Sequence, residues 1–109
     1  MQINNLASTP NILVYYNPQF RDTLENMMAY IRSQSNNAVA VEPITIYQNA
    51  GDLRAIFNEL RIPEELHWIT MRINNLRSMI LTDQKLESLA MPNTDVLEQI
   101  RMRYESAGA

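Results

Sequence analysis

Apolar residues between Ile62 and Leu81 recur at intervals of three or four positions, which is the spacing of one side of an α-helix. Pro63 suits the first turn of such a helix, and Glu64 and Glu65 lie where the helix dipole favours anions. The pattern therefore predicts a helix over residues 63–81. The apolar stripe of this helix consists of Ile62, Leu66, Ile69, Ile73, Leu76 and Ile80.

The same stretch allows a second interpretation, because residues 66–74 also alternate between apolar and polar positions, as a half-buried strand does. The pair Asn74–Asn75 would then form the turn after the strand. We favour the helix because the stripe continues past Asn75 to Ile80. Some large apolar residues lie off the stripe and need to be covered. Another part of this chain is the simpler expectation, and a partner protein is the alternative. These are Trp68, Met71 and Leu81.

Two further apolar runs predict strands, at residues 11–16 and 38–47. Pro43 either confines the second run to a sheet edge or breaks it. Between the runs, a cap at Asn17 predicts a helix over 18–32, and this order favours a parallel pair with a right-handed crossover. A third strand from 68–74, or from a neighbouring chain, would complete the sheet. The apolar side of the helix carries Phe20, Leu24, Met27, Met28 and Ile31.

Other capping and spacing signals predict helices over 52–60 and 94–105, the second with a stripe of Leu97, Ile100 and Tyr104. Thr82–Asp83 would cap a short helix that carries Leu86 and Leu89. The fold class is therefore α/β or α+β, with a small sheet of two to three strands packed by four or five helices. We expect a single domain over 1–109, with a loose N-terminal arm at 1–10 and a frayed tail at 106–109.

The composition of the chain argues against several classes of function. The net charge of −3 argues against nucleic-acid binding, because a surface that binds phosphates needs an excess of Lys and Arg. There is no cysteine for a disulfide or a thiolate metal site, and two glycines are too few for a Gly-rich phosphate loop. No apolar run approaches the roughly twenty residues of a membrane span. We expect neither nucleic acid nor a membrane among the partners.

Residues that could carry chemistry are sparse. His67 is the only histidine, and one His beside Glu64 and Glu65, without a second His at helical spacing, does not form the pattern of a metal site. No nucleophile elbow flanks any serine. We therefore predict no catalytic, cofactor-binding or metal-binding residues, no cofactor and no enzymatic activity.

The string from Pro63 to Asn75, with Leu66, Trp68 and an aliphatic run, resembles a segment of the baseplate wedge proteins of contractile-tailed phages of the T4 type. Residues 53–60 also resemble the short helix before that segment, so the resemblance covers 52–76. The family's proline soon after the asparagine has no counterpart here. The resemblance implies a small structural protein of the virion, assembled in the host cytoplasm, that packs against other tail or neck subunits.

Our functional prediction is a structural assembly subunit of a phage tail, baseplate or neck, whose partners are other virion proteins or copies of itself. Asparagine is a mediocre helix former, so Asn74 and Asn75 are expected to make a specific hydrogen bond or a turn. A small intracellular regulator or adaptor that binds one protein partner is the alternative. The candidate interface residues are Trp68, Met71, Arg72, Asn74, Asn75 and Arg77.

Overall fold

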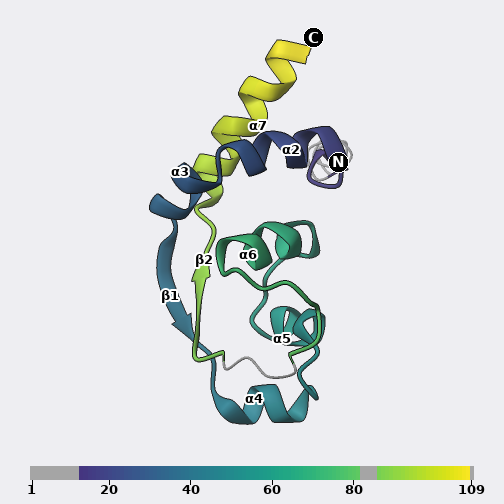
Figure 1. Ribbon diagram of the computed structural model, residues 1–109, viewed down its shortest axis with the longest axis vertical. Helices are drawn as coiled ribbons and strands as arrows, with labels where there is room; N and C mark the ends of the chain where they lie inside the picture. The colour runs from purple at the N-terminus through teal and green to yellow at the C-terminus, as the bar shows by residue number, and fades with distance from the viewer. Residues whose placement is uncertain (1–12, 82–85, 109) are drawn as a thin grey trace, which may run out of the picture. The chain divides into compact units, whose positions relative to one another are not determined.

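A computed structural model describes residues 13–81 and 86–108 of the chain (Figure 1). The described residues form two compact units. Unit 1 combines residues 13–34 with residues 93–108, and unit 2 comprises residues 35–81 and 86–92. The predicted N-terminal arm, residues 1–10, lies outside the described residues, and the single domain stays a prediction.

Unit 1 is helical and contains α2 (Pro18–Asn26), α3 (Met28–Ser33) and α7 (Thr94–Gly108). The Asn17 side chain caps α2 as predicted, because its Oδ1 accepts hydrogen bonds from the amides of Gln19 and Phe20. The predicted helix over 18–32 is confirmed, with a break at Met27, where α2 ends and α3 begins. Helix α7 runs to Gly108, so it extends past the predicted end at residue 105.

The predicted strand at 11–16 is wrong where the structure describes it, and residues 11–12 lie outside the described part. Leu13 and Val14 are helical, and a turn follows in which the amides of Tyr16 and Asn17 donate to the carbonyls of Leu13 and Val14. Leu13 is 60% exposed, whereas Tyr15 is buried. The run is continuously apolar without being continuously buried, which is why its composition was misleading.

Unit 2 contains a two-stranded sheet of β1 (Asn36–Ala40) and β2 (Ser88–Met91), with the helices between them in sequence. These are α4 (Pro43–Gln48), α5 (Leu53–Glu59), the 3₁₀ turn η1 (Glu64–Leu66) and α6 (His67–Ile73). The strands are antiparallel, with Val39 opposite Leu89 and Ala40 opposite Ser88. Helices α5 and α6 lie on one side of the pair (Figure 1). The predicted parallel crossover is therefore wrong.

The second predicted strand, 38–47, is a strand only up to Ala40. Pro43 stands at the first position of α4 and turns the rest of the run into a helix, as its fixed φ permits. The short helix predicted around Leu86 and Leu89 is also wrong, since Leu89 lies in β2; residues 82–85 lie outside the described part. The predicted helix over 52–60 is confirmed as α5, capped by Asp52.

The central helix ends earlier than predicted, at Ile73 instead of Leu81. Asn75 adopts the left-handed conformation with φ 57°, and the Leu76 amide donates to the Met71 carbonyl, which closes a Schellman motif. Residues 79–81 then pair with residues 51–53, through hydrogen bonds between Leu53 and Met79 and between Leu81 and Gly51. The alternative strand at 66–74 is wrong, although the turn at Asn74–Asn75 is present.

The apolar stripe nevertheless predicts burial correctly for five of its six residues, since only Ile80, which is 48% exposed, lies outside the core. The core of unit 2 also contains the buried side of α5 and one residue of β2: Leu53, Ile56, Phe57 and Leu89. With six helices and a two-stranded sheet in the described residues, the fold is a small α+β one, as predicted.

Candidate functional site

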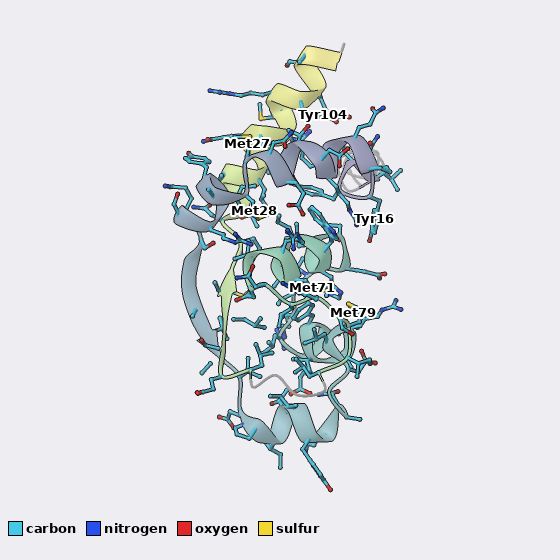
Figure 2. All side chains as sticks on the ribbon, in the orientation of Figure 1. Tyr16, Met27, Met28, Met71, Met79 and Tyr104 are labelled. Carbon is cyan, nitrogen blue, oxygen red and sulfur yellow. The ribbon has the colours of Figure 1, made fainter. Side chains whose placement is uncertain are left out.

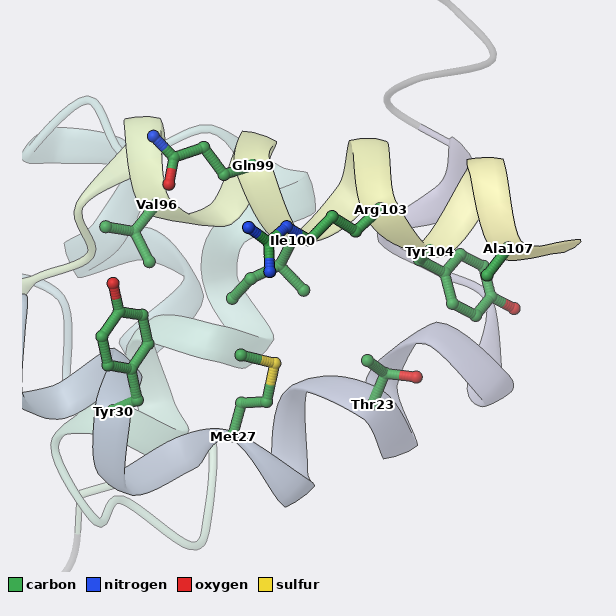
Figure 3. Close-up of a pocket in the computed structure, with 9 residues that line it drawn as sticks. All are labelled: Thr23, Met27, Tyr30, Val96, Gln99, Ile100, Arg103, Tyr104 and Ala107. Carbon is green, nitrogen blue, oxygen red and sulfur yellow. The ribbon is translucent and has the colours of Figure 1, made fainter.

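An apolar groove of about 520 Å³ lies within unit 1, between α7 and the pair α2–α3 (Figure 3). One wall consists of Thr23, Met27 and Tyr30. The other wall is one face of α7, with Val96, Gln99, Ile100, Arg103, Tyr104 and Ala107. We refer to this feature as the α7 groove.

Helical periodicity explains how each wall of the α7 groove arises. On α7 the lining residues are three or four positions apart, so they share one face of the helix. Thr23, Met27 and Tyr30 are spaced in the same way, and Met27 lies at the junction of α2 and α3 (Figure 2). Helix α7 starts at a cap in which Asn93 Oδ1 accepts from the amides of Asp95 and Val96.

The groove is apolar at its base and amphipathic at its edge. Val96 and Ile100 are buried, whereas Tyr30 is 48% exposed and keeps its ring accessible. The Tyr104 ring is held against Phe20, with 5.1 Å between the ring centroids. Arg103 is the one charged residue among those that line the groove, and it has no ion pair within the described part of the chain.

Another side of α7 carries a network of hydrogen bonds between charged side chains. Arg101, which is buried, donates from Nε and Nη2 to Glu98 Oε1 at 3.0 and 2.8 Å, and from Nη1 to Glu105. The hydroxyl of Tyr15 donates to Glu98 Oε2 at 2.5 Å. The hydrogen bond from Arg101 lowers the pKa of Glu98, and the reciprocal bond raises the pKa of Arg101. The network joins α7 to the turn before α2.

The candidate interface residues of the sequence analysis all belong to unit 2. Trp68, Met71 and Arg72 lie on α6 and are partly buried. Arg77 is exposed but lies beyond the end of α6, as do Asn75 and Leu81, so these residues do not share a helical face with Trp68. The structure therefore corrects the predicted single helical surface.

Asn74 is occupied within its own unit. Its Nδ2 donates to the carbonyls of Thr70 and Ala90 at 2.8 and 3.0 Å, and its Oδ1 accepts from the Ala90 amide at 2.8 Å. The side chain thus pairs with both backbone groups of one β2 residue, as a neighbouring strand would. The predicted specific hydrogen bond is present, and it joins the end of α6 to β2.

His67 and Glu64 have local partners. His67 is buried, its Nε2 donates to the Ile62 carbonyl at 2.9 Å, and its ring packs edge-on against Phe57. Glu64 pairs with Arg54 at 3.3 Å. Over residues 13–81 and 86–108, no group of three or more His, Cys, Asp or Glu side chains could hold a metal ion. None of the helices described is long and apolar enough to cross a membrane.

Comparison of the chain with protein-family models, with curated proteins and with solved structures gives no match.

Sequence reasoning missed the α7 groove, although it identified parts of both walls. The predicted apolar side of the first helix contains Met27, and the predicted stripe of the last helix contains Ile100 and Tyr104. The groove depends on how two helices pack that lie more than sixty residues apart in the sequence. The available signal was Tyr30, an aromatic residue three positions after Met27 and off the stripe that contains Phe20 and Leu24.

Proposed function

We propose that this chain is a non-enzymatic structural subunit of a phage virion, in the tail, baseplate or neck, and that it acts by packing against other proteins. The observation that carries this proposal is the α7 groove. It combines a flexible methionine, two tyrosines and a buried aliphatic base, and these are residue types that dominate protein–protein contacts. A single arginine at its edge would fix the register of a partner.

The assignment to a virion is supported by the resemblance of residues 63–75 to baseplate wedge proteins. In the structure this segment forms η1 and α6, and its buried side builds the core of unit 2. A second contact region is proposed from the other predicted residues, because each retains accessible surface: Trp68, Met71, Arg72, Asn75 and Arg77. Asn74 is removed from that region, since its amide is used internally.

The adaptor alternative is supported by the shape of the same groove. Two helical walls with an apolar base form the kind of site that binds a single amphipathic helix of a partner. An adaptor would use the groove for one regulatory protein, whereas a structural subunit would use it in the assembled particle.

Quantitative mass spectrometry of purified particles of the phage that encodes the chain distinguishes the two functions. A structural subunit is expected at a fixed copy number relative to the other particle proteins. A variant with Tyr30→Asp, which places a charge in the groove, is expected to be depleted from particles. Met102→Asp is the matched control, since Met102 is exposed on α7 and does not line the groove. Absence of the chain from particles, together with a stoichiometric complex with one host protein, would establish the adaptor instead.

A further inference from the structure

Helix α4 exposes apolar side chains and places no residue in the buried core. None of its six residues is buried, and Ile44 and Tyr47 are 55% and 84% exposed. They are three positions apart, so they lie on the same side of the helix. Glu42, the exposed residue at the N-cap, makes no capping hydrogen bond and has no ion pair within the described residues. We refer to Glu42, Ile44 and Tyr47 as the α4 knob.

The α4 knob and the α7 groove are complementary in chemistry. The knob offers two apolar anchors and a carboxylate, and the groove offers an apolar base and a guanidinium. Neither charged group has an ion pair with any residue that the structure describes. Arg103 lies three residues from Ile100, about 4.5 Å along the helix axis, so one turn separates the cation from the apolar base. Glu42 is the N-cap residue two positions before Ile44, so its carboxylate belongs to the N-terminal end of α4 rather than to the side that Ile44 and Tyr47 share.

The knob is also shorter than the groove, so it fits within the groove's length. Six helical residues span about 9 Å, whereas the α7 face from Val96 to Ala107 spans about 16 Å. We propose that the α4 knob of one copy of this chain docks in the α7 groove of a second copy, with Glu42 paired to Arg103. This proposal rests on the proposed assembly function and names the partner that the groove receives.

Such a contact is heterologous, because the knob and the groove are different surfaces of the same chain. Two copies can therefore exchange knobs in a closed dimer, or the contact can repeat from copy to copy into a larger ring or a filament. A six-residue helix buries less than the roughly 1,200–2,000 Å² of a standard interface. Each contact is therefore weak, and assembly depends on protein concentration.

Sedimentation velocity of the full chain between about 10 μM and 1 mM tests the proposal, since this is the range expected for a weak contact. Species larger than the monomer are expected as the concentration rises. Tyr47→Ser is expected to weaken the association constant about tenfold or more, whereas Met102→Ser, another exposed apolar residue on a helix, leaves it unchanged. Circular dichroism of each variant verifies that it is folded.

A charge exchange identifies the two surfaces. Glu42→Arg and Arg103→Glu are each expected to weaken self-association about tenfold, because each places like charges together. An equimolar mixture of the two variants restores assembly, since every contact then joins opposite charges. An association that the charge exchange leaves unchanged overturns the proposal.

A wild-type chain that stays monomeric at the highest concentration also overturns the proposal, whether the groove is filled within one chain or by another protein. That result leaves the proposed virion function intact, because the chain would still be found in particles. Absence from particles together with concentration-dependent assembly would refute the virion function alone.

Discussion

The hydrogen bonds of Asn74 predict a large loss of stability for Asn74→Ala. The substitution removes the bonds to the Thr70 carbonyl and to both backbone groups of Ala90. Each such bond contributes about 0.5–1.5 kcal/mol net, and the Ala90 groups must then find water or stay unpaired. We expect the free energy of unfolding of unit 2 to fall by about 2–4 kcal/mol, a large part of the marginal stability of a small protein.

Equilibrium unfolding in urea, followed by the fluorescence of the only tryptophan, measures this loss. Trp68 lies on α6, so its emission reports on the same unit as Asn74. Asn58→Ala is the matched control, because Asn58 is an exposed asparagine on α5 whose side chain has no hydrogen bond within the described residues. Its unfolding free energy is expected to change by less than about 0.5 kcal/mol.

A second substitution at the same position separates the donor from the acceptor. Asn74→Asp keeps an oxygen for the Ala90 amide but loses the Nδ2 donor, and it places a carboxylate beside the carbonyls of Thr70 and Ala90. At pH 7 it should be at least as destabilising as Asn74→Ala. The reasoning is refuted if either variant unfolds within about 0.5 kcal/mol of the wild type, the range of ordinary surface substitutions.

Three further substitutions test other features by urea unfolding. Arg61→Gly should stabilise unit 2 by up to about 1 kcal/mol, because φ 64° at a helix end costs a side chain about 1–2 kcal/mol and glycine returns part of that as chain entropy; no gain would contradict this. Gly51→Ala should destabilise it by at least about 1–2 kcal/mol, since φ is 74° and the new Cβ would lie 2.8 Å from the Leu81 carbonyl oxygen. Arg101 lowers the pKa of Glu98, so that pair stabilises above the ordinary glutamate pKa and is lost as the pH falls through the lowered value. Glu98→Gln should lower the free energy of unfolding by about 0.2–1 kcal/mol at pH 7 and by less near pH 3. An equal loss at both pH values would contradict this prediction.

The sequence predicted those parts of the fold that local chemistry determines. The caps at Asn17 and Asp52 set the starts of α2 and α5, and the stripe from Ile62 to Leu76 identified the core side of the central segment. Each of these features is decided within a few residues, by a side chain that bonds to its own backbone or by helical periodicity.

Several of the errors share a cause, which is that long-range pairing overrides local pattern. Strand β1 pairs with β2 from the other end of unit 2, so no nearby run could have identified its partner. The stripe continued past Asn75, yet the Ala90 backbone holds Asn74 and the left-handed Asn75 redirects the chain. The groove was missed for the same reason, since its walls, α2 and α7, come from opposite ends of the chain.

The ends of α4 bear on whether it can act as a docking element. A helix of six residues, none of which is fully buried, has little stability of its own. Here Pro43 fixes the first turn, and the Gly51 amide donates to the Ile46 carbonyl to close a Schellman motif with Ala50 at φ 53°. Asn49 adds bonds from Nδ2 to the Thr45 carbonyl and to Glu59 on α5.

These constraints hold Ile44 and Tyr47 in place without burying them. Ordering a flexible segment on binding costs roughly 1–2 kcal/mol per residue in backbone entropy, which a contact of this size could not offset over six residues. Because α4 is already ordered by its ends, most of that cost is absent and a small apolar contact can be net favourable. The same reasoning explains why the knob can be exposed and apolar at once. Its conformation depends on backbone hydrogen bonds at its two ends, so the side chains of Ile44 and Tyr47 stay accessible to a partner.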